Sequence, residues 1–183
     1  MMQVGEECKS VRNASRPQNA RRQGAGDHPP SEMLACGMIF RDALPEDIPY
    51  IVSLLADDRL GAQREQLGDP AYAKALQDID ADPTTRFIVV EDDGIVVGCM
   101  QMSILPGLAR RGVRRAQLES VRIAGSQRSK GLGAAMVAEG VRLAKEAGCG
   151  LIELSTDKTR ADAHRFWKRQ GFEDTHVGMK MFL

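Results

Sequence analysis

The sequence predicts one α/β domain built on a mixed β-sheet, and three observations support this fold class. Strand-like and helix-like segments follow one another along residues 38–183 in the order β-α-α-β-β-β-α-β-α-β. A chain of 183 residues with 43% hydrophobic content can bury the core of one such domain. Residues 1–37 lack this pattern, and Val11–Pro30 carries few large apolar side chains, which predicts a disordered N-terminal extension.

The first half of the domain contains clear start and stop signals. Pro45 suits the first turn of one helix, and Pro83 ends a second helix that precedes it at 71–80. The residues Asp92-Asp93-Gly94 separate two apolar runs, which is typical of a β-hairpin. The elements expected here are a strand at 38–43, helices at 45–58 and 71–80, and strands at 86–90 and 95–102.

The second half repeats the alternation of strands and helices. Gly148 and Gly171 each follow a helical pattern and would end it in a left-handed conformation. Val177, Met179 and Met181 alternate with other residues, which predicts a last strand. The elements expected here are a strand at 117–123, a helix at 130–147, a strand at 151–154, a helix at 159–170 and a strand at 177–181.

The composition argues against several classes of partner. The 25 Lys and Arg residues balance 25 Asp and Glu residues, so neither nucleic acid nor an anionic membrane is expected as a partner. No apolar run approaches the roughly 18 residues of a membrane span. The four cysteines are scattered, with no C-x-x-C pair. We therefore expect no bound metal, no disulfide framework and a cytoplasmic location.

The segment Leu118–Ala134 has the pattern of a phosphate-binding turn: a strand, a turn rich in Gly and Ser, and then a helix. Gly131 and Gly133 would let the backbone approach a ligand closely, and Arg128 and Lys130 add positive charge. The order Ser-Lys-Gly does not fit a Walker loop, and Met136 stands where a dinucleotide fingerprint needs its third glycine. On these residues alone, a helix start with incidental glycines remains equally open.

Two motifs resemble those of the Gcn5-related N-acetyltransferases (GNAT). Gln127–Gly133 reads Q-R-x-x-G-x-G, similar to the acetyl-CoA motif of the family, and Asp162–Phe172 (DAHRFWKRQGF) resembles its second signature. Residues 54–65 and 156–167 are also similar to a bacterial subfamily. The resemblance covers Ile39 to Leu183. It implies a GNAT-like fold at 38–183, splayed between the fourth and fifth strands, and an acyltransferase that uses acetyl-CoA and no metal.

The resemblance also implies a set of cofactor-binding residues. The fourth-strand segment whose backbone would pair with pantetheine, with one N–H polarising the thioester carbonyl, comprises Val121, Arg122 and Ile123. The turn that would hold the pyrophosphate comprises Arg128, Ser129, Lys130, Gly131, Leu132 and Gly133. The arginines between residues 110 and 115 would either bind an anion, such as the 3′-phosphate of CoA, or form a solvated loop.

Only a few residues are candidates for catalysis or for binding the acceptor amine. Trp167 stands where many family members have a tyrosine that protonates the departing thiolate. Because an indole N–H donates a hydrogen bond but no proton, Trp167 either assists the sulfur, packs in the core, or does both. Glu119 is the favoured general base, on the same strand face as Val121 and Ile123, with a solvated or ion-paired glutamate as the equal alternative. Asp57 and Asp58 end the first helix and would bind a cationic amine or remain solvated.

The expected function is therefore the transfer of an acetyl group from acetyl-CoA to a primary amine of a small molecule. The expected partners are acetyl-CoA, that amine and a second copy of the chain. Two other functions stay open: a non-catalytic acyl-CoA-binding regulator, and a peptide or protein N-acetyltransferase. An N-acetyltransferase releases free CoA when it is given an amine, whereas a regulator binds the cofactor without turnover.

Overall fold

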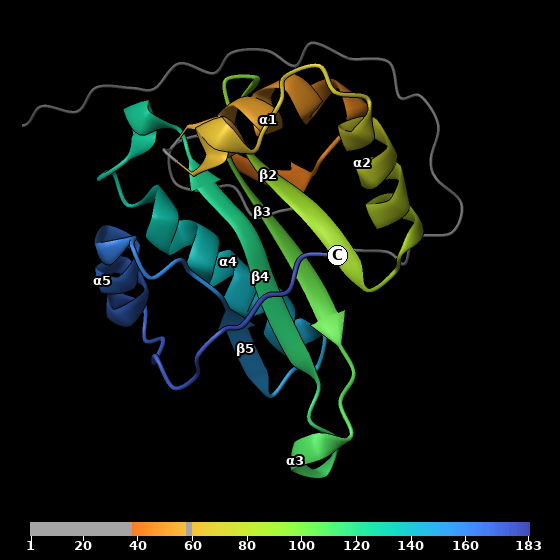
Figure 1. Cartoon of the computed structure of the whole chain (residues 1–183), viewed down its shortest axis with the longest axis vertical. Coiled ribbons are helices and arrows are strands. Elements are labelled where there is room, and N and C mark those ends of the chain that lie inside the picture. The colour runs from red at the N-terminus through yellow and green to blue at the C-terminus, as the bar shows by residue number, and fades with distance from the viewer. Residues whose placement is uncertain (1–37, 58–59) are drawn as a thin grey trace, which may run out of the picture.

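The structure is a computed structural model that describes residues 38–57 and 60–183. The proposed disordered extension, 1–37, and Asp58 lie outside the described residues. The described chain forms one sheet in the order β1-β2-β3-β4-β5, in which the first four strands are antiparallel and β5 is parallel to β4 (Figure 1). The strands are β1 (Ile39–Asp42), β2 (Thr85–Asp92), β3 (Ile95–Leu105), β4 (Arg115–Ile123) and β5 (Leu151–Leu154). This mixed sheet confirms the predicted fold class.

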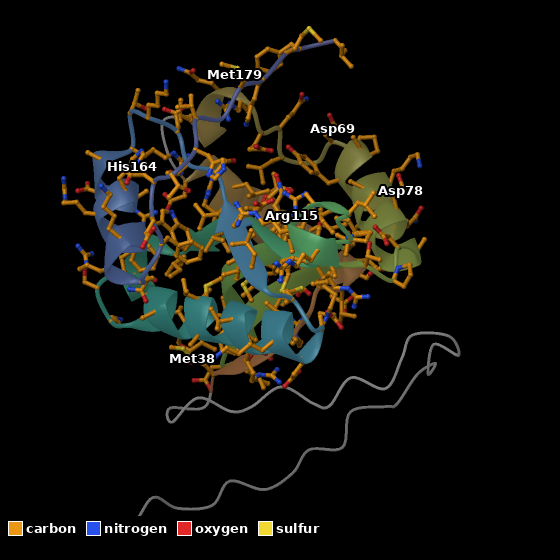
Figure 2. The ribbon with its side chains drawn as sticks, turned by 90° about the horizontal axis from the view of Figure 1, so that it is seen from below. Met38, Asp69, Asp78, Arg115, His164 and Met179 are labelled. Carbon is orange, nitrogen blue, oxygen red and sulfur yellow. The ribbon has the colours of Figure 1, made fainter. Side chains whose placement is uncertain are left out.

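Helices cover both faces of the sheet. On one face α4 packs over a core that includes Met100, Leu118 and Met136. On the other face α1 and α2 cover a second core that includes Val89 and Cys99. Figure 2 separates the two sides: α4 lies on one, and the C-terminal segment that carries Met179 lies on the other. The helices are α1 (Ile48–Ala56), α2 (Ala71–Ala81), α3 (Ala109–Gly112), α4 (Leu132–Glu146) and α5 (Ala161–Arg169).

Three short 3₁₀ helices complete the described chain: Pro45–Asp47, Gly61–Gln63 and Gly125–Gln127. No helix of residues 38–57 and 60–183 is long and apolar enough to cross a membrane.

The predicted last strand is wrong. Residues 172–183 adopt no regular structure after α5, and the apolar side chains meant to face a core are exposed: Val177 by 69%, Met179 by 92% and Met181 by 83%. Alternation of apolar residues predicts a strand only where a neighbouring strand supplies hydrogen-bond partners, and this segment instead crosses the sheet (Figure 1).

One α-helix of the described residues was not predicted. The tip of the β3–β4 hairpin coils into α3, where Arg110, Arg111 and Gly112 have positive φ angles of 54°, 61° and 80°. Such a left-handed turn carries no apolar periodicity, so the sequence pattern could not indicate it.

Candidate active site at the β4–α4 turn

The turn between β4 and α4 is shaped for an anion. It runs from Gly125 through a 3₁₀ turn to Gly131, the residue that caps α4. Ser129 and Gly131 have φ angles of 63° and 86°, and glycine is the residue that adopts this conformation without strain. The first N–H groups of α4 cannot bond within the helix, and the helix dipole favours negative charge there. The predicted cradle for a phosphate therefore has a suitable backbone.

The side chains of the turn differ in exposure. The side chains of Arg128, Ser129 and Lys130 are exposed. Leu132 is 4% exposed and belongs to the core beneath α4, so only its backbone could contact a phosphate. Gln127 donates a hydrogen bond to Asp92 Oδ2 at 3.2 Å, which ties the turn to the β2–β3 hairpin.

Gly133 has a packing role that the sequence did not reveal. A Cβ atom at this position would lie 3.1 Å from Cε2 and Cζ of Phe166 and 3.2 Å from Cδ1 of Ile123. These distances are shorter than ordinary carbon contacts. Gly133 therefore lets the start of α4 approach α5 and β4 closely, in addition to any role at a ligand.

The β4 and β5 strands part at the same end of the sheet. Their parallel pairing runs from Arg115 with Leu151 to Leu118 with Leu154, and β4 then continues to Ile123. Along that continuation, no described strand pairs with β4 on the side of β5, and the carbonyl oxygen of Val121 accepts a hydrogen bond from Nη1 of Arg122 at 3.0 Å. This is the splayed arrangement that the GNAT resemblance implies, and it leaves the segment 121–123 able to hydrogen-bond an extended ligand.

A β-bulge interrupts β4 at Ser120. Gln101 pairs with Glu119 and Cys99 pairs with Arg122, so β4 has one residue more than β3 between the two pairs. Ser120 has a φ angle of 52°, and its carbonyl oxygen accepts a hydrogen bond from Sγ of Cys99 at 3.5 Å. Burial raises the pKa of the Cys99 thiol to about 12, so the thiol keeps the proton that it donates.

The bulge changes which residues share a face. Val121 and Ile123 pack on the α4 side of the sheet. Arg122 pairs with Cys99, which belongs to the core on the opposite side, and Glu119 lies on that opposite side as well. The prediction that Glu119 shares a face with Val121 and Ile123 is therefore wrong, because the extra residue reverses the alternation. Glu119 is exposed on the α1 side of the sheet.

Asp57 lies beside the turn. It follows the last residue of α1, and its Oδ2 atom accepts a hydrogen bond from Nη2 of Arg128 at 2.5 Å. A shallow cavity of about 330 Å³, wide open to solvent, lies there and is lined by Ser53, Leu54, Ala56, Asp57, Ala124 and Gly125. The structure thus brings a predicted acceptor residue into contact with a predicted cofactor residue, which sequence reasoning did not foresee.

Trp167 belongs to an aromatic cluster formed by α5 and the segment that follows it. Its ring meets Phe166 edge-on at a centroid distance of 4.9 Å and Phe172 at 5.4 Å. Phe166 is also the side chain nearest to Gly133, so this cluster anchors α5 against the start of α4. These contacts agree with the interpretation of Trp167 as a packing residue.

The arginine-rich loop is remote from the turn. Figure 1 shows α3 at the opposite end of β4 from the start of α4. Arg114 donates to the carbonyl oxygen of Ala147 at 2.9 Å, and Arg115 pairs with Glu153 at 2.9 Å. Arg115, which Figure 2 labels, is the first residue of β4, at the end of that strand away from the turn. This geometry does not support a role for the loop in holding the 3′-phosphate of CoA.

The described residues also indicate which kinds of cofactor the protein could hold. Within 38–57 and 60–183, no group of three or more His, Cys, Asp or Glu side chains is placed to hold a metal ion. The turn lies at the N-terminus of α4, where backbone N–H groups favour an anion, and it is next to the part of β4 that extends beyond its pairing with β5.

Comparisons with known proteins agree with this geometry. The sequence model of the acetyltransferase (GNAT) family matches residues 49–172. An aminoalkylphosphonate N-acetyltransferase from Salmonella typhimurium is 25% identical over 137 residues, which cover 75% of this chain and 86% of that protein.

Two solved structures have the same fold. A transcriptional regulator from Bacillus halodurans C-125 is 38% identical, with a TM-score of 0.77 over 80% of this chain and 99% of its own. A Clostridium acetobutylicum protein described as a predicted acetyltransferase, solved with acetyl-CoA, has a TM-score of 0.61 at 19% identity, over 79% of this chain and 96% of its own. These matches agree with the turn and the splayed strands. They show that the chain belongs to the acetyltransferase (GNAT) family and is an N-acetyltransferase.

Proposed function

We propose that the protein transfers the acetyl group of acetyl-CoA to a primary amine of a small molecule. The observation that carries this proposal is the combination of the turn at Gly131, at the N-terminus of α4, with the splay between β4 and β5 beside it. Acetyl-CoA supplies the acetyl group as a thioester. The backbone at the turn would bind its pyrophosphate, and Arg128 and Lys130 would add charge-assisted contacts.

The segment Val121–Ile123 would hold the pantetheine arm by backbone hydrogen bonds. One N–H of this segment would polarise the thioester carbonyl as the amine nitrogen attacks its carbon, and the carbon–sulfur bond would then break. The bulge at Ser120 supports this role, because it turns the following backbone out of the regular β3–β4 alternation.

Glu119 would take the proton that the attacking amine loses. Its carboxylate is exposed on the α1 side of the sheet, where a water molecule could relay the proton. Trp167 would donate its indole N–H to the leaving sulfur, and solvent would supply the proton of the thiol. The edge-on contacts of Trp167 with Phe166 and Phe172 would fix the ring for either role.

The acceptor would bind at the cavity beside Asp57. A carboxylate on the wall of a cavity of about 330 Å³ suits a cationic amine of small size. The relative from Salmonella typhimurium, whose name states that it acetylates aminoalkylphosphonates, supports a small-molecule acceptor in preference to a peptide or protein.

The relative from Bacillus halodurans favours a second candidate function. That protein is described as a transcriptional regulator and is 38% identical to this chain. A regulator that binds acetyl-CoA would also explain a tryptophan at the position of a proton-donating tyrosine. The two functions differ in turnover, which separates them by experiment.

Calorimetric titration with acetyl-CoA tests the proposal directly. We expect one site per chain with micromolar affinity, followed by release of free thiol with a small amine. The amines to be screened are 2-aminoethylphosphonate, spermidine, an aminoglycoside and a peptide with a free N-terminus. Binding without thiol release from any of them would favour the regulator, and no binding would contradict both functions.

We also propose that the protein is a homodimer. The support is the C-terminal segment, whose Val177, Met179 and Met181 are exposed, and such an apolar run is typical of an interaction site. Light scattering should then give twice the chain mass of 20.0 kDa. The variant Met179→Lys with Met181→Lys should give a folded monomer, and a monomeric wild-type protein would refute the dimer.

A further inference from the structure

Arg128 and Asp57 form an ion pair between the two halves of the candidate site. Nη2 of Arg128 lies 2.5 Å from Oδ2 of Asp57 and 3.4 Å from its carbonyl oxygen. The two residues are 71 positions apart in the sequence, so the fold brings them together. Their side chains are 56% and 50% exposed.

The same guanidinium is the charged group that the proposed function gives to the pyrophosphate. Pyrophosphate bound there would bring its negative charge next to the Asp57 carboxylate, and like charges at such a distance repel. A half-exposed ion pair contributes little to stability, so replacing it has a small cost. Arg128 therefore faces two anions that compete for it.

We propose that acetyl-CoA displaces Asp57 from Arg128, and that this exchange frees the Asp57 carboxylate to bind the acceptor amine. This inference rests on the proposed function, because it assumes that pyrophosphate binds at the turn. Asp57 lines the cavity beside the turn. Its Oδ2 atom would lie 3.9 Å from a Cβ atom added to Gly125, the residue at the beginning of that turn. The released carboxylate would remain on the cavity wall.

The exchange has a consequence for the order of binding. While Arg128 holds Asp57, a cationic amine must compete with a guanidinium for the carboxylate. Once pyrophosphate holds Arg128, the carboxylate is left without that cation and attracts the ammonium form of the amine. One ion pair thus favours binding of acetyl-CoA before the amine, and Asp57 becomes a residue that selects cationic acceptors.

A double-mutant cycle on acetyl-CoA affinity tests the exchange, with four proteins titrated by calorimetry: wild type, Asp57→Asn, Arg128→Ala and the double variant. We expect Asp57→Asn to tighten binding about threefold to tenfold, because the competitor is gone, and Arg128→Ala to weaken binding about tenfold or more. In the Arg128→Ala background, Asp57→Asn should tighten binding clearly less than in the wild-type background, because only the like-charge repulsion remains to be removed.

Asp92→Asn provides the matched control. It removes one carboxylate that also contacts the turn, through Gln127, but that has no hydrogen bond to Arg128 among the described contacts. If Asp57→Asn and Asp92→Asn tighten binding equally, the effect is general electrostatics and the exchange is refuted. Tightening by Asp57→Asn that is equally large with and without Arg128 would refute it as well.

The cycle also separates the two proposals. If Arg128→Ala weakens acetyl-CoA binding while Asp57→Asn does not change it, the cofactor site stands and only the exchange fails. If the wild-type protein does not bind acetyl-CoA, both proposals fail. Circular dichroism of each variant checks the fold, which these exposed side chains should leave intact.

Discussion

The variant Gly133→Glu is expected to lose acetyl-CoA binding by at least about 100-fold and to unfold at a lower temperature than the wild type. The loss of binding follows from charge. A carboxylate in the first turn of α4 would lie close to bound pyrophosphate, and two like charges about 4 Å apart repel by about 4 kcal/mol at an effective dielectric of about 20. Calorimetry with acetyl-CoA measures this effect.

The loss of stability follows from packing. The new Cβ would lie 3.1 Å from the ring of Phe166 and 3.2 Å from Ile123, so the start of α4 must move away from α5 and β4. Overpacking of this kind costs about 1–3 kcal/mol, which corresponds to a fall in Tm of roughly 2–12 °C for a chain of this size.

Gly133→Ala separates the two causes. It introduces the same Cβ without the carboxylate, so it should lower Tm by a similar amount while keeping acetyl-CoA affinity within about tenfold of the wild type. If both variants lose binding equally, packing of α4 against Phe166 controls the site, and the idea of close phosphate approach at residue 133 is wrong. Unchanged affinity in Gly133→Glu would refute the cradle itself.

Local sequence patterns were enough to predict most of the fold and the turn. The order of strands and helices, the hairpin at Asp92-Asp93-Gly94 and the turn before α4 depend on residues close together in the chain. The positive φ angles at Gly94 and Gly131 show why glycine stands at these turns. Short-range geometry of this kind is encoded within a few residues, and the predicted elements other than the strand at 177–181 therefore fall within a few residues of the observed ones.

Features that depend on distant parts of the chain could not be predicted. The bulge at Ser120 has no Gly or Pro to mark it, and a thiol from β3 bonds to its carbonyl. Because the bulge was not expected, Glu119 was assigned to the wrong face of β4. The contact between Arg128 and Asp57 likewise requires the end of α1 to meet the β4–α4 turn in space. No spacing in the sequence carries that information.

The position of Glu119 leads to the second large effect. Glu119→Gln is expected to lower the rate of acetyl transfer by about 100-fold or more at acidic pH, which is typical for the loss of a general base. The pH dependence follows from the amine. An alkyl amine with a pKa near about 10 is almost fully protonated at acidic pH, so attack requires a group that removes a proton. As the pH rises, more of the amine is already neutral, and the variant should approach the wild-type rate.

The matched control for this experiment is the variant Glu153→Gln. Glu153 is a carboxylate on the neighbouring strand β5, paired with Arg115 at 2.9 Å, on the part of the sheet where β4 and β5 are still joined. Glu153→Gln removes one negative charge from the sheet, as Glu119→Gln does, but its pH–rate profile should be the same as that of the wild type. Rates of thiol release between about pH 6 and pH 10 would show the difference. If Glu119→Gln also keeps the wild-type profile, Glu119 is not the base, and the exposed side of β4 at the bulge takes no part in proton transfer.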